Sequence, residues 1–417
     1  MLEDHLIPRR RMRLAAAASL GAALAITVTA CSSSSSSGTA GSSPAASGSL
    51  AATGSPAASG GTGAVPAADN LKAAGCPSTI TLQTDWNPEA EHGGQYELLG
   101  PNPTINAGAK SVTGELVAHG GIDTGVQLQI RAGGPAIGYQ TVSSQMYKDS
   151  SITLGYLGTD EQIALSQTQP TVAVMAGLEI SPQIIQWSPA AHPTWKTIAD
   201  IGKTSTPVLY YQGASYMDYL IGKGVLKKSQ VNGSYDGTPT VFVASGGQDA
   251  VQGFATAEPY IWSHDVRSWD KPLKYQLIAD AGFNFYQQEI GVRKDKLAAL
   301  TPCLKKLVPI MQQAVVDYIT NPASTEKLIL QLVTAYNNGW VYTQGTADYA
   351  VATMKKLGIV GDAPDGTLGA FTDARVQQLI GILTPIYAKQ GKQTLPGLKP
   401  SDIVTNQFID PSISLKA

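Results

Sequence analysis

Charged residues are scarce in this chain, and neither sign dominates. Asp, Glu, Lys and Arg make up 14% of the 417 residues, and 29 basic side chains face 31 acidic ones. A nucleic-acid-binding protein needs a basic surface, which this balance does not indicate. Hydrophobic residues, at 43%, are numerous enough for two domains with cores of their own.

Residues for common catalytic and metal-binding motifs are scarce too. The chain has 5 histidines scattered along its length, and it contains neither G-x-S-x-G nor H-E-x-x-H. We therefore predict a binding protein without a cofactor, a metal or catalytic residues. The weaker alternatives are a metal site formed by Asp85, Glu89, Glu91 and His92, and a catalytic site with His92 as the base.

The N-terminus carries an export signal. Residues 9–13 form a basic segment with four arginines, residues 14–30 form a mainly apolar run, and this run ends in Val-Thr-Ala before Cys31. This ending looks like a bacterial lipobox, so we predict a signal peptide at 1–30 and lipidation of Cys31. The alternatives are a plain secretory signal and, more weakly, a membrane anchor, because about 17 apolar residues are at the short limit for a span.

A segment without core-forming residues follows Cys31. Residues 32–37 are all serine, and a mixture of Ser, Gly, Ala and Pro continues to about residue 66. Such a composition is typical of a flexible tether, here residues 31–70, with an average reach of roughly 35 Å. The predicted location is the extracytoplasmic face of the cell membrane, reached by Sec or by twin-arginine export.

Cysteine is rare, with 3 in the whole chain. If Cys31 carries lipid, Cys76 and Cys303 remain in a compartment that permits disulfides. We predict one bridge between them; the alternative is two unpaired thiols.

Strand-like and helix-like segments alternate from residue 79 onward, which predicts an α/β protein with mixed sheets flanked by helices. Predicted strands lie at 80–82, 126–131, 152–157, 171–178, 208–211, 241–244 and 275–279. Predicted helices lie at 94–99, 136–147, 215–222, 248–256, 302–320, 324–337, 347–357 and 373–390. Residues 101–123 fit neither pattern and are read as an insertion with a hairpin at Gly120-Gly121.

The turn after the first strand reads TDWNPEAEHGGQYELL, residues 84–99. In alternating sheets, ligands bind beyond the carboxyl ends of the strands. A Gly-Gly pair at a helix start permits close approach, aromatic rings can stack, and Asp85, Glu89 and His92 supply polar contacts. The structural alternative is that Glu89 and Glu91 cap the helix while Trp86 fills the core.

The pattern D-W-x-P-x-x-x-H-x-G-x-Y at residues 85–96 resembles the opening motif of solute-binding proteins for thiamine pyrimidine precursors. These proteins group with the taurine-, sulfonate- and nitrate-binding components of ABC importers and have type II periplasmic-binding folds. Looser similarity extends from residue 79 to about 300, including a Gly-Gly turn at 133–134 and GGQDAV at 246–251 before Glu258. The chain departs from the family at Glu89, where Asn is usual, and in its insertion after Gly100.

The resemblance implies a lipid-anchored, monomeric receptor that delivers a small-molecule ligand to ABC permease subunits. It implies a two-lobed type II periplasmic-binding-protein fold, with lobe 1 at 71–180 and 287–417 and lobe 2 at 181–286. The family's pyrimidine synthase has a Cys-rich motif that this chain lacks, which favours binding over synthesis. The alternatives are a secreted hydrolase or other enzyme on a two-lobed fold, a binding protein for a sulfonate or other small anion, and a sensor or adhesion protein without transport.

Arg131 is the only basic residue near a predicted site turn, so we expect a neutral or weakly cationic planar nitrogen heterocycle of the aminopyrimidine type. It would stack on Trp86 or Tyr216 and donate a hydrogen bond to Glu258. The full set of candidate ligand-binding residues is Asp85, Trp86, Glu89, His92, Gly94, Tyr96, Gly133, Gly134, Tyr156, Thr159, Asp160, Trp187, Gly213, Ser215, Tyr216, Glu258 and Tyr260.

Overall fold

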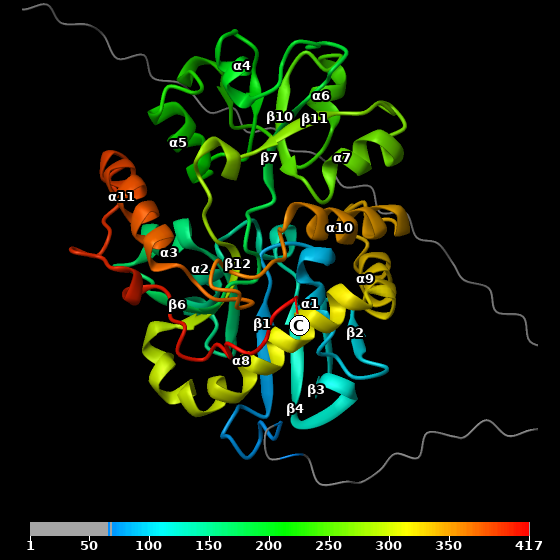
Figure 1. Ribbon diagram of the computed structural model, residues 1–417. Coiled ribbons are helices and arrows are strands. Elements are labelled where there is room, and N and C mark those ends of the chain that lie inside the picture. The colour runs from blue at the N-terminus through cyan, green and yellow to red at the C-terminus, as the bar shows by residue number, and fades with distance from the viewer. Residues whose placement is uncertain (1–65, 67–68, 417) are drawn as a thin grey trace, which may run out of the picture. The chain divides into compact units, whose positions relative to one another are not determined.

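Figure 1 shows the computed structural model, which describes Pro66 and residues 69–416. The predicted signal peptide, the lipidated Cys31 and the tether up to residue 65 lie outside the described residues and stay predictions. Among the described helices, none combines the length and the apolar character that crossing a membrane requires.

The first sheet has seven strands in the order β2-β3-β4-β1-β5-β12-β6 and mixes parallel with antiparallel pairs. The strands span Thr104–Asn106 (β2), Ser111–Ala118 (β3), Ile122–Arg131 (β4), Thr79–Gln83 (β1), Leu154–Gly158 (β5), Gln287–Arg293 (β12) and Thr171–Met175 (β6). The central strand β1 ends at Gln83, so the turn at 84–92 leaves from the middle of the sheet.

Helices cover both faces of this sheet, because neighbouring strand residues point to opposite sides. Tyr156 of β5 lies in the core that includes α8, whereas Leu157 packs with α2. On the α8 side lie α1 (Gly93–Tyr96), α8 (Leu297–Thr320), α9 (Ala323–Tyr336) and α10 (Gln344–Leu357). On the other side lie α2 (Val142–Lys148) and α3 (Thr159–Leu165). We call this sheet with its helices the first lobe.

The second lobe is built on a five-stranded mixed sheet in the order β11-β7-β10-β8-β9. Its strands span Lys274–Leu277 (β11), Gln183–Trp187 (β7), Ala250–Phe254 (β10), Val208–Leu209 (β8) and Val231–Asn232 (β9). Its helices span Ile198–Gly202 (α4), Ser215–Gly222 (α5), Thr240–Ala244 (α6) and Glu258–Tyr260 (α7). In Figure 1 this lobe lies above the first, and α7 faces α10.

Two segments, 176–182 and 278–286, carry the chain between the sheets. They contact each other, because the Ser181 amide donates to Asn284 Oδ1 over 3.4 Å. Ser181 Oγ also donates to Gln287 Oε1, at the start of β12, over 2.8 Å. Helix α11 (Asp373–Lys389) packs on α3 of the first lobe and on α5 of the second. The predicted lobe boundaries at 180–181 and 286–287 fall at these crossings.

The structure confirms the predicted fold class, with two mixed sheets flanked by helices and a mostly helical C-terminal part. It also confirms the bridge between Cys76 and Cys303, which ties the segment before β1 to α8 across 227 positions of the sequence. The insertion forms β2 and β3, and the hairpin turn at His119–Gly121 places Gly120 and Gly121 at positive φ, which favours glycine.

Two predicted elements of the second lobe are wrong. Residues 241–244, predicted as a strand, form α6, and residues 248–256, predicted as a helix, contain β10. Short apolar runs cannot be assigned from periodicity alone. Strand β10 has partners on both sides and is covered on both faces, so its residues show no alternation. Strand β7 was not predicted at all.

Candidate functional site

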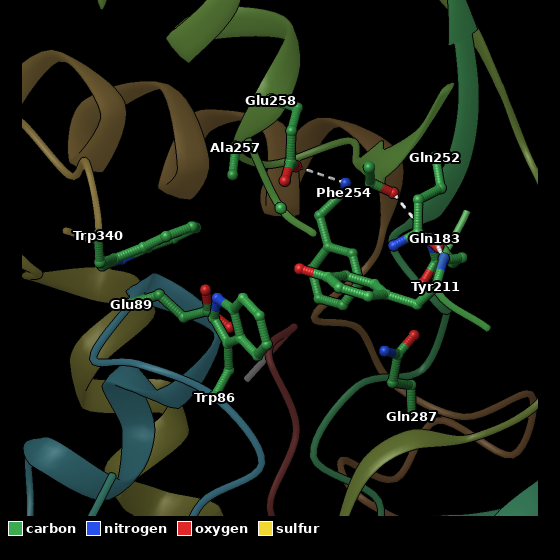
Figure 2. Close-up of a pocket in the computed structure, with 12 residues that line it drawn as sticks. Trp86, Glu89, Gln183, Tyr211, Gln252, Phe254, Ala257, Glu258, Gln287 and Trp340 are labelled. Atoms are coloured by element: carbon green, nitrogen blue, oxygen red, sulfur yellow. Dashed lines mark hydrogen bonds between the residues drawn. The ribbon is translucent and has the colours of Figure 1, made fainter. Parts of the chain in front are cut away.

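A cavity of about 170 Å³ lies between the two lobes. The first lobe contributes the turn after β1, the start of β12 and the loop between α9 and α10. The second lobe contributes β7, β10, the segments after β8 and β9, and the turn from β10 into the start of α7. Figure 2 draws the lining residues, which are Trp86, Glu89, Gln183, Tyr211, Gly237, Gln252, Gly253, Phe254, Ala257, Glu258, Gln287 and Trp340.

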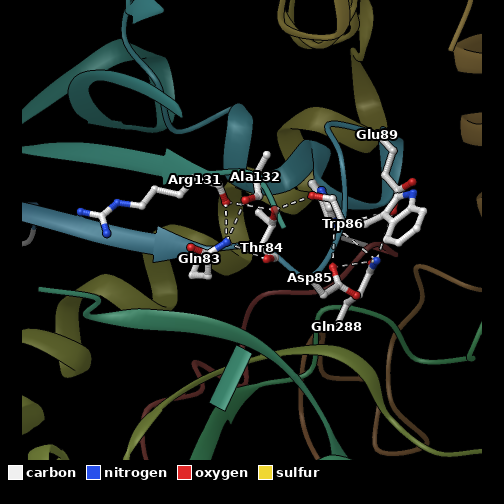
Figure 3. A network of polar contacts seen from close by, with 9 residues as sticks. Gln83, Thr84, Asp85, Trp86, Glu89, Arg131, Ala132 and Gln288 are labelled. Atoms are coloured by element: carbon white, nitrogen blue, oxygen red, sulfur yellow. Dashed lines mark hydrogen bonds and ion pairs between the residues drawn. The ribbon is translucent and has the colours of Figure 1, made fainter. Parts of the chain in front are cut away.

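The backbone of the turn after β1 is held by hydrogen bonds to the end of β4, as Figure 3 shows. Gln83 Nε2 donates to the carbonyls of Arg131 and Ala132 over 3.2 and 3.0 Å. Thr84 Oγ1 donates to the carbonyl of Trp86 over 2.8 Å. These contacts fix the position from which the Trp86 ring enters the cavity.

The Gly-Gly turn after β4 packs directly on this segment. The amide of Gly133 donates to the carbonyl of Trp86 over 2.8 Å, and the amide of Gly134 donates to that of Asp85 over 2.9 Å. A Cβ at Gly133 would lie 2.2 Å from the Thr84 carbonyl oxygen. Gly134 has a φ of 55°, and a Cβ there would lie 2.6 Å from the Trp86 ring. Both predicted glycines therefore position Trp86 through close packing.

A polar network lies behind the cavity wall. Nε2 of the fully buried His92 lies 3.0 Å from Asp85 Oδ1 and 3.7 Å from Glu89 Oε1. Gln288 Nε2 donates to the same two carboxylates over 3.3 and 3.4 Å. The network links Asp85, Glu89 and His92, three residues of the predicted motif, to β12 and orients the Glu89 carboxyl.

The acids at the cavity have raised pKa values. Burial raises the pKa of Glu89 well above its ordinary value, and repulsion from Glu91, Asp85 and Glu258 adds to this shift. Burial raises the pKa of Glu258 to about 7, against the effect of the Phe254 amide, which donates to its carboxylate over 2.6 Å. Burial also raises the pKa of Glu91, whose carboxylate accepts a hydrogen bond from Thr256 of the second lobe.

Aromatic rings form the walls. The Trp86 ring centroid lies 6.0 Å from those of Tyr211 and Trp340, with interplanar angles of 64° and 88°. Tyr139 stands beside Trp86 at the same 6.0 Å, but it is 59% exposed and lies at the rim. Among the described residues, neither the Tyr211 hydroxyl nor the Trp340 Nε1 has a hydrogen-bond partner. Rings at steep angles around one space are suited to enclosing a small ligand.

Polar amides hold the second-lobe wall in place. Gln252 Oε1 accepts hydrogen bonds from the Tyr211 amide, over 2.8 Å, and from the hydroxyl of the buried Tyr216. Tyr216, a predicted stacking residue, thus positions Gln252 and is not among the residues that line the cavity.

Four predicted residues are core residues. Gly94 and Tyr96 pack on the α8 side, where a Cβ at Gly94 would lie 2.6 Å from a Val315 methyl group. Tyr156 is buried and stacks on His92 with centroids 4.9 Å apart. Trp187 is 1% exposed and packs against Trp195 in the second lobe.

The remaining predicted residues lie near the lobe junction, outside the cavity lining. Ser215 donates to Asp160 Oδ2 over 2.5 Å, which joins the N-terminus of α5 to that of α3. Thr159 is buried and exchanges hydrogen bonds with the backbone of Tyr286. Gly213 occupies an exposed turn with a φ of 91°, and Tyr260 of α7 stacks on His264.

The structure therefore brings Trp86, Glu89 and Glu258 together at the cavity, with Asp85 and His92 directly behind. Arg131 does not join them, because its guanidinium binds Asp149 over 2.9 Å, and Figure 3 shows it extended away from the turn. Sequence reasoning missed Trp340, which lies in the loop between two predicted helices; an aromatic residue after Asn-Asn-Gly was the signal available. Within residues 69–416, no group of three or more His, Cys, Asp or Glu side chains is arranged to hold a metal ion.

Scans against protein-family models and against curated proteins found no match. Solved structures show similarity at low identity. A protein from Bordetella bronchiseptica RB50 has a TM-score of 0.49 and 15% identity, covering 80% of this chain and 96% of that one. The alkanesulfonate-binding protein SsuA from Xanthomonas axonopodis pv. citri, bound to MOPS, has a TM-score of 0.49 and 12% identity, covering 79% and 99%. An ABC transporter protein from Parabacteroides distasonis has a TM-score of 0.46 and 10% identity, covering 81% of this chain and 100% of that one. Because these values are low, the function has to be inferred from the cavity itself.

Proposed function

We propose that the protein is the solute-binding receptor of an ABC importer, with a type II periplasmic-binding architecture, and that it captures a small planar nitrogen heterocycle between its lobes. The observation that carries this proposal is the aromatic cavity, which is lined from both lobes. A pocket of this kind closes and opens when two lobes rotate about their connections. The resemblance of the 85–96 motif to pyrimidine-precursor receptors supports the ligand class.

The contacts around the cavity support a closed state. Glu91 of the first lobe accepts a hydrogen bond from Thr256 of the second. At the N-terminus of α10, Thr343 and Thr346 donate to Asp265 of the second lobe over 3.2 and 3.1 Å. These bonds are few and polar, so water can replace them when the lobes separate. The two crossing segments would act as the hinge.

The lining favours binding over catalysis and disfavours an anion. It contains no Ser, Thr, Cys, His, Lys or Arg among the described residues. A nucleophile with an adjacent base, as in acyl transfer, is therefore missing from the wall. A sulfonate would meet two carboxyl groups and no guanidinium or ammonium group. We accordingly propose a receptor that acts as a monomer and returns its ligand unchanged.

Ligand capture from a natural mixture tests this proposal. The purified protein would be incubated with a low-molecular-weight extract of its host's growth medium, passed through a desalting column and denatured, and the released compounds identified by mass spectrometry. We expect one compound at about one per chain, chemically unchanged, and absent from a Trp86→Ala, Tyr211→Ala double variant. A chemically altered compound would indicate an enzyme, and equal retention by the variant would place binding elsewhere.

Membrane attachment is the second part of the proposal. Lipid on Cys31 and the tether to about residue 70 would hold the receptor near its permease. In cells, Cys31→Ser should move the protein from the membrane fraction into the medium. A variant that stays in the membrane fraction would show that the apolar segment itself is the anchor.

A further inference from the structure

The cavity contains an excess of negative groups with no basic side chain to balance it. Glu89 and Glu258 are the ionisable acids among the lining residues, and none of the described residues that line the cavity is Lys, Arg or His. Asp85 and Glu91 lie close enough to raise the pKa of Glu89 by repulsion. Behind the wall, His92 is the nearest group that can carry a positive charge, and it is shared with Asp85. Ionised carboxyl groups removed from water need a positive partner.

The rings provide a second, independent feature. Trp86 is bordered by Trp340 and Tyr211, each with its centroid 6.0 Å away and its plane at a steep angle. Figure 2 shows Trp340, Glu89 and Trp86 on one side of the space, Tyr211 on the other and Glu258 above. The faces of aromatic rings attract cations that lie within about 6 Å of the centroid, most strongly when water is excluded. The aromatic rings and the carboxyl groups thus both favour a positively charged ligand.

The volume limits the size of the ligand. An apolar cavity of about 150 Å³ in another protein binds benzene, and the present cavity measures about 170 Å³. In the closed state it therefore has room for about one six-membered ring with a small substituent.

We infer that the ligand enters this cavity as a small organic cation, a single ring whose protonated or quaternary nitrogen lies between Trp86, Trp340 and Tyr211 and is balanced by Glu89 and Glu258. This inference rests on the proposed function and narrows its ligand class from a nitrogen heterocycle of any charge to a positively charged one. It also accounts for Glu89, the position at which the motif departs from the family it resembles.

Three one-ring probes that differ in charge test the inference by titration calorimetry at about pH 8. N-methylpyridinium is the cation, 3-methylpyridine is neutral at this pH, and benzenesulfonate is the anion. We expect the cation to bind at least tenfold more tightly than either of the others. Glu89→Gln and Glu258→Gln should each weaken the cation at least fivefold and leave 3-methylpyridine within twofold of its original affinity.

Glu161→Gln is the matched control. Like Glu258, Glu161 has a pKa that burial raises to about 7, but it accepts a hydrogen bond from the Ser143 amide and lies outside the cavity lining. The Glu161→Gln variant should bind all three probes with the affinities of the native protein. Thermal unfolding of each variant would show that it is folded.

The outcomes separate this inference from the proposed function. If the neutral probe binds as tightly as the cation and Trp86→Ala abolishes its binding, the charge assignment is wrong while the receptor function stands. Tightest binding of benzenesulfonate, or no measurable binding of the cation, would also overturn the inference. The proposed function fails separately, if the growth-medium extract yields no compound that depends on Trp86 and Tyr211.

Discussion

Two groups of buried or partly buried carboxyl side chains lie near the junction of the lobes, and they differ in what surrounds them. We call them the cavity group and the hinge group. The cavity group is Asp85, Glu89, Glu91 and Glu258, and the hinge group is Asp160, Glu161 and Glu289. In each group, burial raises the pKa of several members.

The hinge group has an internal cation, Arg375 of α11. Burial raises the pKa of Glu289, repulsion from Asp160 adds to the shift, and attraction from Arg375 opposes it. The Arg375 guanidinium donates to the carbonyls of Glu179, at 2.7 Å, and of Asn284, at 2.7 Å, one on each crossing segment. Its plane lies over the Tyr286 ring, with Cζ 3.6 Å from the centroid. This guanidinium therefore attracts the Glu289 carboxyl and joins the two crossings.

The cavity group has neither feature. Within the described chain the one basic side chain paired with it is His92, and its members line or adjoin an open space instead of a packed junction. The difference teaches that similar raised pKa values have two structural meanings. The protein itself supplies a cation beside the hinge group, whereas the cavity group would receive its cation from a bound ligand.

The largest expected effect comes from removing the hinge cation. Arg375→Met should lower the free energy of unfolding by about 3–5 kcal/mol, because it leaves the carboxylate and carbonyl partners without their donor. Urea unfolding measures this. Arg131→Met is the control, since its pair with Asp149 is partly exposed and is expected to contribute less than about 1 kcal/mol. If both variants lose the same free energy of unfolding, Arg375 contributes no more to stability than the partly exposed pair of Arg131 does.

The next largest effect is expected in the pH dependence of the free energy of unfolding, measured without ligand. Glu161, Glu179, Glu258 and Glu326 have pKa values raised to about 7. A folded state that holds protons more tightly than the unfolded chain loses stability as pH rises from about 4.5 to 7. The free energy of unfolding should therefore fall by at least about 2 kcal/mol between pH 5 and pH 8. A stability that rises across this interval would contradict the pKa assignments.

Ligand binding should sharpen the comparison between the groups. A cation that binds only when Glu258 is ionised must displace the proton from the Glu258 carboxyl. Glu89 and Glu91 are the acids that act on this carboxyl by repulsion or are repelled by it. Affinity for N-methylpyridinium should then rise about tenfold between pH 6 and pH 8, for a pKa of about 7. Calorimetry should show this slope in the native protein and in Glu161→Gln, and lose it in Glu258→Gln. A slope that survives Glu258→Gln would assign the proton to another group.

The smallest effect is expected at Glu289. Its side chain is fully buried, and burial raises its pKa well above the ordinary value, which favours the neutral form of the carboxyl. Glu289→Gln replaces one neutral hydrogen-bonding group by another and should change stability by less than about 1 kcal/mol. Unfolding at pH 7 and one titration with N-methylpyridinium measure both quantities. A large loss would show that Glu289 is ionised and paired with Arg375.

The sequence was informative where function is carried by one continuous segment. The turn at 84–92 could be recognised because its strand, its glycines and its polar residues are adjacent, and four of its residues lie at or behind the cavity wall. The Cys76–Cys303 bridge could be predicted by counting the cysteines that remain after Cys31. The alternation of elements indicated the two sheets, although β10 was taken for a helix because a strand covered on both faces has no period of two.

The rest of the site depends on tertiary structure. Trp340 comes from a loop more than 250 positions after Trp86, and only the packing of α9 and α10 brings it to the cavity. Trp187 looked like a stacking residue, yet β7 places it in a core, since the strand is buried along its length. Arg375 gave no signal, because its function arises from two crossing segments that are about 100 positions apart.

A crystal structure of the protein with N-methylpyridinium tests the central claim most directly. We predict one ring in the cavity, enclosed by Trp86, Trp340 and Tyr211, with its charged nitrogen facing Glu89 or Glu258. A cavity that contains only water at saturating probe, with the cation bound at the outer surface, would contradict the account.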